Sequence, residues 1–585
     1  MSAPESSKAE PTSSAPPVEL APPPRCELGW RARSIDWAIA LGLAVAYVAI
    51  LLSTVKNLGY ARDEGFYFQA SKSYAQWFQI LLSTPKQALE PAVVDRFWRA
   101  NSEHPAFVKS LFALSYMYPF AKWKWFAEEG TAFRFPAMVL SGSALSIVYL
   151  WARRILGTDF RGRLCALAGA VLLGAMPRVF YHSHLDCFDM PVLAMWLVTT
   201  YAYWRTTQSG RWGAAILTGV LYGLLLNTKH NSWLLPFALA PHLLLLGQLK
   251  FWRRPLEGRR GALKAWLCMA TIGPALFYAT WPWIWHHTAE RLRGYARFHL
   301  HHDYYNMEFL GHTYWQPPMP RGYAPVMTVA TVPTITLTLF ALGLVVAFRR
   351  PLVEGLRWLR RKPSGALPLH FPSFALWACC VLVSYGPWVK SDTPIFGGTK
   401  HWIQAYPFVA LFAAVGLWVS LDRLLLLVRS QRVALRRGLQ VAVTCAVLSA
   451  PVVTTWNSHP WGLSAYVPLV GGAPGAASLG LNRTFWGYAT GYAAEWINRE
   501  APRNARIFIH DTAQQSWQMM VKDGRLRRDL QVVWRPSDAD IAIYHHEPHM
   551  LKVEYQVWVA FGTVRPAWVG AHDGVPVIWI YQRPR

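Results

Sequence analysis

The chain has 585 residues, of which 53% are hydrophobic, 14% are aromatic and only 15% are charged. This charged fraction lies well below the ~25% that is usual for soluble domains, so a wholly soluble globular protein is excluded. The formal net charge of +26 would suit nucleic-acid binding, but the basic residues gather in short gaps between apolar stretches. Because such gaps set orientation in a bilayer, we expect a membrane protein with no nucleic-acid partner.

The N-terminal segment is rich in Pro, Ser, Ala and Glu up to residue 24. We predict that residues 1–30 form a disordered cytoplasmic tail. The first apolar run lies too far into the chain and is too long for a cleaved signal peptide, so it should act as an uncleaved anchor. The seven cysteines show no metal-ligand spacing and are expected to pack as small side chains.

Eleven apolar stretches are candidate membrane-spanning helices. With the N-terminus inside, the short basic loops face the cytoplasm and the C-terminus lies outside, as the charge rule requires. The predicted fold is therefore a polytopic α-helical membrane domain over residues 31–456. Its expected spans are 37–55, 133–152, 164–181, 189–204, 212–227, 232–249, 263–284, 326–348, 371–388, 402–420 and 439–456.

Two outer segments are too long to be simple connections. The first outer loop, 56–132, contains amphipathic runs at 66–78 and 107–120, which predict helices lying in the membrane interface; two short extra spans are the weaker alternative. After residue 457 the pattern changes to alternating apolar runs at 506–511, 540–546, 555–562 and 575–582, which predict strands, preceded by a short helix at 492–500. Residues 457–585 should form a small α/β outer domain.

Asp63 and Glu64 follow directly on the first predicted span. Adjacent acids at a membrane surface must be solvated, paired or used chemically, because burying them unpaired is costly. A solvated pair is the simplest interpretation of an isolated Asp-Glu, but other polar clusters recur at the same predicted face. Because both acids lie outside the apolar span, we expect neither to contribute much to stability.

Further polar residues should converge on this outer face. Arg178 and Lys229 could merely extend to the interface, whereas acids in a tight hairpin between apolar spans are functional candidates. A carboxylate can deprotonate a hydroxyl while Arg or Lys stabilises charge on a departing phosphate, so the pattern indicates a membrane enzyme acting on a lipid phosphate. The candidates are Glu103, His104, Lys109, Arg178, Asp186, Asp189, Lys229, His230 and Lys400.

A second hypothesis concerns the histidine-rich segment 297–315. Imidazole is a common metal ligand, so Glu103 with His299, His301 and His302 could hold a divalent metal. No fixed ligand spacing is present, and acceptor-binding or packing roles stay open for the histidines. No other cofactor is expected.

A membrane chain whose first outer loop opens with Asp-Glu resembles the C-type glycosyltransferases, above all the protein O-mannosyltransferase and aminoarabinose transferase group. The likeness covers the layout of residues 35–420. It implies an inverting transfer of a sugar from a polyprenyl phosphate to a hydroxyl acceptor on the outer face. Asp63 matches the catalytic acid of the family, and Glu64 its frequent companion.

The resemblance also implies roles for other residues. Glu103, His104 and Pro105 resemble a Glu-Lys-Pro segment of aminoarabinose transferases, with His104 departing from the Lys and Lys109 as a compensating cation. Asp189 resembles the second acid of these enzymes, with Asp186 as its rival. Histidines of the segment 299–302 fall where some relatives place a metal-binding His. The predicted lipid-phosphate contacts are Arg178, Lys229 and Lys400.

The sequence thus predicts a glycosyltransferase of a bacterial inner membrane, with Asp63 as general base and the α/β domain in the periplasm. The acceptor could be a protein, lipopolysaccharide or another lipid. The rival hypothesis is a polytopic transporter or lipid flippase. It is less favoured because transporters commonly show repeats and charged residues at mid-membrane depth, whereas here the charges gather at one face.

The topology can be tested by thiol labelling of sealed cells. Cysteines introduced near Arg260 and Arg357 should be protected from an impermeant reagent added outside, because their basic loops stay cytoplasmic. A cysteine near Gly472 should react. Labelling of the basic loops from outside, with the site near Gly472 protected, would overturn both the topology and the proposed reaction face.

Overall fold

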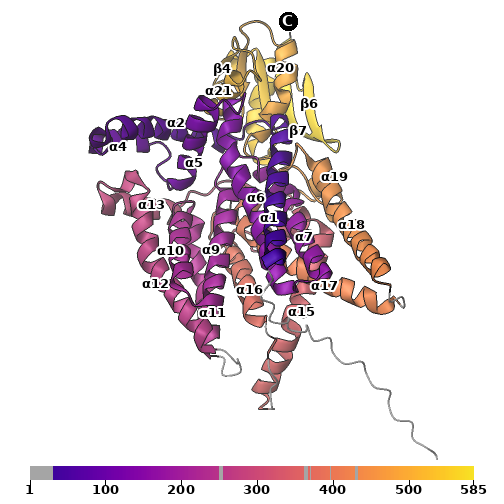
Figure 1. Ribbon diagram of the computed structural model, residues 1–585. Helices are drawn as coiled ribbons and strands as arrows, with labels where there is room; N and C mark the ends of the chain where they lie inside the picture. The colour runs from indigo at the N-terminus through magenta and orange to yellow at the C-terminus, as the bar shows by residue number, and fades with distance from the viewer. Residues whose placement is uncertain are drawn as a thin grey trace, which may run out of the picture.

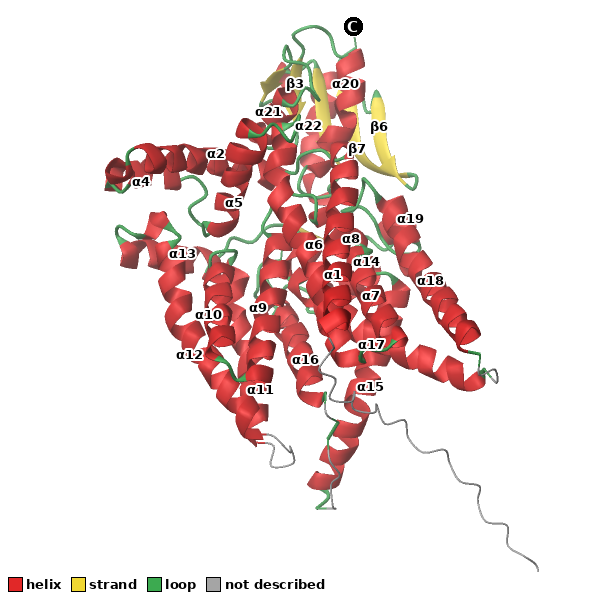
Figure 2. Cartoon of the chain, in the orientation of Figure 1, coloured by secondary structure: helices red, strands yellow, loops and turns green. Residues whose placement is uncertain are grey.

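A computed structural model describes residues 30–248, 255–361, 367–368, 370–395, 397–428 and 432–584. The predicted disordered tail, apart from Trp30, lies outside the described residues. The described chain is a bundle of long helices with the strands of a small sheet at one end (Figure 2). The predicted fold class, a polytopic helical protein with a C-terminal α/β unit, is confirmed.

Every expected span is occupied by a helix. Seven of the described helices (α1, α6, α12, α15, α16, α17 and α18) are long and apolar enough to cross a membrane, so the count of eleven spans stays a prediction. The helices are α1 (Trp30–Thr54), α6 (Glu129–Leu156), α7 (Phe160–Gly174), α9 (Asp189–Ser209), α10 (Trp212–Leu226), α11 (Leu235–Gln248), α12 (Pro255–Ala279), α15 (Thr334–Leu359), α16 (Phe371–Tyr385), α17 (Tyr406–Leu427) and α18 (Val433–Ser458).

Two expected spans each divide into two α-helices. The stretch 164–181 divides into α7 and the short α8 (Pro177–His182), and the stretch 326–348 divides into α14 (Tyr323–Thr331) and α15. Pro177 begins α8 and Pro333 lies between α14 and α15. Proline has no N–H to donate and disfavours helical backbone in the preceding residue, which explains both breaks.

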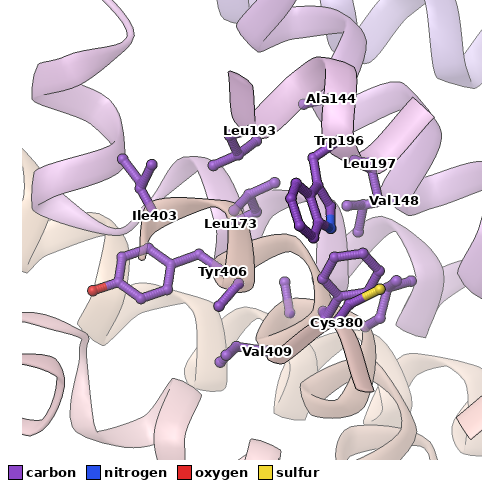
Figure 3. Close-up of a cluster of buried hydrophobic side chains, with 14 of the residues drawn as sticks. Ala144, Val148, Leu173, Leu193, Trp196, Leu197, Cys380, Ile403, Tyr406 and Val409 are labelled. Atoms are coloured by element: carbon purple, nitrogen blue, oxygen red, sulfur yellow. The ribbon is translucent and has the colours of Figure 1, made fainter. Parts of the chain in front are cut away.

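The bundle core is apolar and closely packed. Trp196 of α9 lies in one buried cluster with Val148 of α6 and Val409 of α17 (Figure 3). Small residues let helix backbones approach: a Cβ added at Gly343 of α15 would lie 2.0 Å from the carbonyl oxygen of Phe412 in α17. Such close approach is how helices associate where apolar side chains gain little by leaving lipid.

The first outer loop is helical, as predicted. It forms α2 (Arg62–Ser83), α3 (Pro85–Ala88), α4 (Pro91–Trp98), α5 (Phe107–Ser115) and the π-helical segment η2 (Tyr116–Lys122). Figure 1 shows α2 and α4 running across the end of the bundle, above α13 (Thr288–Leu300). Tyr74, Trp77, Trp98, Trp281 and Tyr295 belong to one buried aromatic cluster that joins this layer to the bundle.

The C-terminal unit contains a five-stranded sheet of order β4-β3-β5-β7-β6. Strands β4, β3 and β5 are parallel, whereas β7 pairs antiparallel with both β5 and β6. The short helix α20 (Ala494–Glu500) was predicted, whereas α21, β4 and β6 were not. The bounds are β3 (Arg506–Ile509), α21 (Gln514–Lys522), β4 (Gln531–Val533), β5 (Ile541–His545), α22 (Leu551–Phe561), β6 (Trp568–His572) and β7 (Val575–Gln582).

One predicted strand is wrong. The run 555–562 lies almost wholly in helix α22, whose buried side chains are Glu554, Val557 and Phe561. These positions are three and four residues apart, which is the spacing of one helix face. The aromatic and β-branched residues of a short apolar run favour a strand locally, and tertiary packing overrides that preference.

Polar contacts fix the C-terminal unit to the bundle. Asp523 accepts hydrogen bonds from the backbone amides of Glu129 (2.9 Å) and Gly130 (3.1 Å), so it occupies the N-terminus of α6. A carboxylate there satisfies amides that have no partner within the helix and complements the helix dipole. Arg525 donates to the carbonyl oxygen of Leu58 and to Glu128, both at 2.6 Å. The sheet is therefore anchored where α1, α2 and α6 meet.

Candidate active site

A cavity of about 340 Å³ opens where the bundle end, the outer-loop helices and the C-terminal unit meet. Its size falls at the lower end of the range typical of small-molecule sites. Ionisable side chains from all three parts of the fold line it. Nine sequence-predicted residues do so: Asp63, Glu103, His104, Asp189, Lys229, His230, His299, His302 and Lys400.

Asp63 lies in the first turn of α2, where the helix dipole favours a negative charge. Its side chain is 22% exposed and stands between two cations. Oδ2 lies 3.6 Å from Nζ of Lys400, and Oδ1 lies 3.9 Å from Nε of Arg62. The carboxylate of Asp63 therefore faces the cavity, where a molecule bound beside the two cations can reach it.

Lys400 reaches the cavity from η6 (Gly398–His401), just before α17. Its Nζ lies 3.7 Å from the ring centroid of Trp486 in the C-terminal unit, a cation–π contact. Burial lowers the pKa of Lys400, while the carboxylates of Asp63 and Asp189 oppose that shift. Gly397 has φ +73°, and a Cβ there would lie 2.2 Å from Cε of Lys400. The left-handed backbone of this turn therefore favours glycine.

Asp189 and Lys229 form a buried ion pair that lines the same cavity. Nζ of Lys229 lies 2.7 Å from Oδ1 of Asp189, and Nδ1 of His182 lies 3.5 Å from Oδ2. An ammonium group has three N–H donors, so the pair leaves donors for a ligand. Lys229 thus lies inside the protein rather than extending to the membrane interface.

The segment 101–104 forms another wall of the cavity. Lys109 does not line the cavity; it is fully buried and donates to the carbonyl oxygens of Asn101 (2.5 Å) and His104 (2.9 Å). Burial lowers the pKa of Lys109 to about 7. The lysine therefore supports the segment that carries Glu103 and His104 instead of contacting a ligand.

The predicted metal set is not assembled. Nε2 of His299 is hydrogen-bonded to the backbone oxygen of Glu103 at 2.8 Å, and its ring stacks on that of His230 with centroids 4.1 Å apart. His301 is exposed and does not line the cavity, whereas His302 does. Within the described ranges, no three His, Cys, Asp or Glu side chains are grouped to hold a metal ion.

The sequence predicts Glu64 as a companion of the catalytic acid with little part in stability, and the structure places it elsewhere. It is fully buried and does not line the cavity. Its carboxylate accepts hydrogen bonds from Nε and Nη2 of Arg134, each at 2.7 Å. It also accepts from the backbone amides of Ala61 (2.8 Å) and Asp186 (3.0 Å). Glu64 therefore holds together the start of α2, the hairpin between α8 and α9 that contains Asp186, and α6.

Two other candidates lie behind the cavity wall. Arg178 is 1% exposed, and its guanidinium lies 5.3 Å from the ring centroid of Tyr466. Asp186 is fully buried, and burial together with the charge of Glu64 raises its pKa well above the usual range. Neither residue lines the cavity, so neither is placed to contact a substrate directly.

The C-terminal unit supplies cavity residues that we did not predict. Nη1 of Arg62 lies 2.5 Å from Oδ1 of Asp511, so one flank of Asp63 is held by this unit. A usable signal was present, because Asp511 and Glu547 stand at the ends of the predicted strands 506–511 and 540–546. The structure shows that these strands are parallel, and α/β sheets bind ligands at the carboxyl ends of such strands. The lining residues of the unit are Asn482, Phe485, Trp486, Asp511, Glu547, His549 and Met550.

Residues 120–283 match the profile of the family described as dolichyl-phosphate-mannose-protein mannosyltransferase. No curated protein matches the chain. Among solved structures, the chain is similar to ArnT from Cupriavidus metallidurans bound to undecaprenyl phosphate, with 14% identity, 95% of this chain and 98% of that chain covered, and a TM-score of 0.42. It is also similar to the archaeal oligosaccharyltransferase AglB from Archaeoglobus fulgidus in complex with an inhibitory peptide and a dolichol-phosphate, with 10% identity, 92% and 72% covered, and a TM-score of 0.45.

The family match confirms the predicted resemblance to membrane glycosyltransferases over the matched segment. That segment runs from η2 through α12 and includes both Asp189 and Lys229. The TM-scores lie below 0.5, so the reaction is argued below from the cavity residues of this chain.

The contribution of the buried Glu64–Arg134 pair to stability can be measured. Arg134→Met should lower the free energy of unfolding by roughly 3–5 kcal/mol, because it leaves a buried carboxylate without its partner. Thermal unfolding of the purified protein in detergent measures the loss. The matched control is Arg499→Met, since the Arg499 side chain is 62% exposed. An Arg134→Met protein as stable as the control would show that the pair is dispensable.

Proposed function

We propose that this protein transfers a sugar, with inversion, from a polyprenyl-phosphate donor to a hydroxyl acceptor. The observation that carries the proposal is the 3.6 Å approach of the Asp63 carboxylate to the Lys400 ammonium within one cavity. A base and a phosphate-binding cation are the two groups that this reaction needs side by side. The family match over residues 120–283 supports it.

The donor phosphate would be bound by Lys400 and Lys229, which both line the cavity. The acceptor hydroxyl would lie against Asp63. Its oxygen bonds to the anomeric carbon as the bond from that carbon to the phosphate oxygen breaks, and the hydroxyl proton passes to Asp63. The departing polyprenyl phosphate gains negative charge, which the two lysines stabilise. A single displacement from the opposite side inverts the anomeric carbon.

The reaction face follows from the position of the cavity. The cavity is lined by residues of the C-terminal unit, and this unit lies at one end of the bundle (Figure 1). The charge rule predicts that this end is outside, which in a bacterial inner membrane is the periplasm. Phe66, Tyr67 and Phe298 also line the cavity and offer apolar surface to a lipid chain or a sugar ring.

The role of Asp63 is tested by replacing its carboxylate with an amide. Asp63→Asn should reduce turnover by roughly 10²–10⁴-fold, because the amide is nearly the same size but cannot accept the proton. Transfer from a polyprenyl-phosphate sugar is measured in purified protein, with donor binding and melting temperature as checks that the fold is intact. Asp392→Asn is the matched control, because the side chain of Asp392 is 54% exposed and outside the cavity. Near-normal transfer by Asp63→Asn would remove the proposed base, and a transporter would show uptake without any transfer.

Replacing Lys400 should instead weaken binding of the donor phosphate. Lys400→Gln removes a charged contact to the phosphate worth ~1.5–3 kcal/mol, so the affinity for undecaprenyl phosphate should fall by about 10- to 100-fold. Asp63→Asn should leave this affinity largely unchanged. Binding is followed by intrinsic tryptophan fluorescence, since Trp486 lies against Lys400. Equal affinities in Lys400→Gln and unmodified protein would contradict the donor site.

A further inference from the structure

Trp486 of the C-terminal unit has a backbone conformation that a large side chain rarely adopts. Its φ is +73°, in the left-handed region, and the next residue, Gly487, has φ +56°. A positive φ is uncommon outside glycine, and for a bulky side chain it is an outlier. Such strained backbone persists only where the surrounding structure holds the residue in place, and it is concentrated at functional sites.

The turn formed by Trp486 and Gly487 is held from two sides. A Cβ added at Gly487 would lie 1.8 Å from the carbonyl oxygen of Asp511, so the turn packs directly on the segment that follows β3. The carbonyl oxygen of Trp486 accepts a hydrogen bond of 2.8 Å from the backbone amide of Arg62. Arg62 begins α2, where backbone amides have no partner within the helix. The turn thus joins the C-terminal unit to the helix start that carries Asp63.

The ring of Trp486 is the part of this turn that contacts Lys400. Nζ of Lys400 lies 3.7 Å from the ring centroid, and Trp486 is only 4% exposed. An ammonium group is attracted to the face of an aromatic ring, and the attraction is stronger where water is excluded. His182 contacts the same ring edge-on, with centroids 5.8 Å apart. The strained turn therefore directs an aromatic face onto the ammonium of Lys400.

Lys400 stands farther from its acid than the neighbouring lysine does. Nζ of Lys229 lies 2.7 Å from Oδ1 of Asp189, whereas Nζ of Lys400 lies 3.6 Å from Oδ2 of Asp63. Hydrogen bonds between an ammonium and a carboxylate are ~2.7–2.9 Å long, so only the first pair is hydrogen-bonded. A carboxylate that accepts such a bond has to break it before it takes a proton from a hydroxyl. The longer spacing therefore suits a base.

We propose that Trp486 is a positioning residue whose ring holds the ammonium of Lys400 away from Asp63, so that Asp63 can accept the proton of the acceptor hydroxyl. The ring and the carboxylate both attract the ammonium, and the spacing of 3.6 Å is the balance between them. The inference rests on the proposed sugar transfer. It adds to that reaction a part for the C-terminal unit, which acts on the base through Lys400.

A double-mutant cycle on the full-length protein in lipid nanodiscs tests this role. Transfer is measured at saturating undecaprenyl-phosphate mannose, with a threonine-containing peptide and lipopolysaccharide as acceptors. Trp486→Leu should lower kcat by about 10- to 100-fold, because the ammonium of Lys400 then forms a hydrogen bond with Asp63 that must be broken. In a Lys400→Met background no ammonium can approach the base, so Trp486→Leu should change kcat by less than about twofold.

Two further variants complete the cycle. Trp486→Phe should retain much more activity than Trp486→Leu, because a phenyl ring also attracts the ammonium. The control is Trp534→Leu, which should leave kcat unchanged, since Trp534 is 66% exposed and outside the cavity. Equal losses of kcat on Trp486→Leu with and without Lys400 would show a merely structural tryptophan and overturn the inference. So would a normal kcat in Trp486→Leu.

A second measurement covers the case in which Trp486→Leu does not fold. Tryptophan with increasing numbers of ring fluorine atoms, incorporated at position 486 alone, keeps the shape of the ring and weakens its attraction for a cation. The kcat should fall stepwise along this series, at an unchanged melting temperature. A kcat that does not respond to fluorination would overturn the inference.

Failure of the proposed function gives a different result. If the unmodified protein transfers mannose to neither acceptor, the proposed function fails, and the role of Trp486 is decided by geometry alone. In a crystal structure of Trp486→Leu, or of the fluorinated protein where that variant does not fold, Nζ of Lys400 should have moved to within ~2.9 Å of Asp63. An unchanged distance of 3.6 Å would overturn the inference whatever the protein transfers.

Discussion

The buried pair of Glu64 and Arg134 fixes the start of α2, where Asp63 faces the cavity. Glu64 belongs to α2 and Arg134 to α6, and both side chains are fully buried. Arg134 also donates to the carbonyl oxygen of Gly59 at 2.5 Å, which fixes the chain as it leaves the first helix. Removing two charges from water is expensive and is offset only when the remaining donors and acceptors are satisfied. Here the backbone amides of Ala61 and Asp186 donate further hydrogen bonds to the Glu64 carboxylate.

This pair orients Asp63 through the geometry of the helix. Successive residues of an α-helix point about 100° apart, since a turn contains ~3.6 residues. When Glu64 is directed into the protein, its neighbour is directed elsewhere, and here that direction is the cavity. The carboxylate that would act as base is thus held by the rigid start of α2 rather than by a mobile loop. Rigid support of this kind keeps a reacting group within the narrow range of productive positions.

Acidic and basic side chains are paired within the cavity. Asp63 lies between Arg62 and Lys400, and Asp189 pairs with Lys229. Each acid therefore has a cation beside it, and both lysines line the cavity. The C-terminal unit takes part in this arrangement, because its Asp511 holds Arg62 and its Trp486 packs against Lys400. It is a wall of the site as well as an appended domain.

The sequence by itself determined the helical membrane architecture. Apolar runs and short basic loops are local features of the sequence, and they decide which segments span a bilayer and how those segments are oriented. It also determined which residue types would gather at one face, and Asp63, Asp189, Lys229 and Lys400 do meet in the cavity. Tertiary structure decided which side of each helix faces inward, and so separated Asp63 from Glu64, two adjacent acids that look alike in sequence. It decided that the run 555–562 is helical, because Val557 and Phe561 are buried on one face of α22. It alone placed Asp511 and Glu547 in the same cavity as Asp63 and brought Asp511 into contact with Arg62. A contact between residues 449 positions apart leaves no periodicity in the chain.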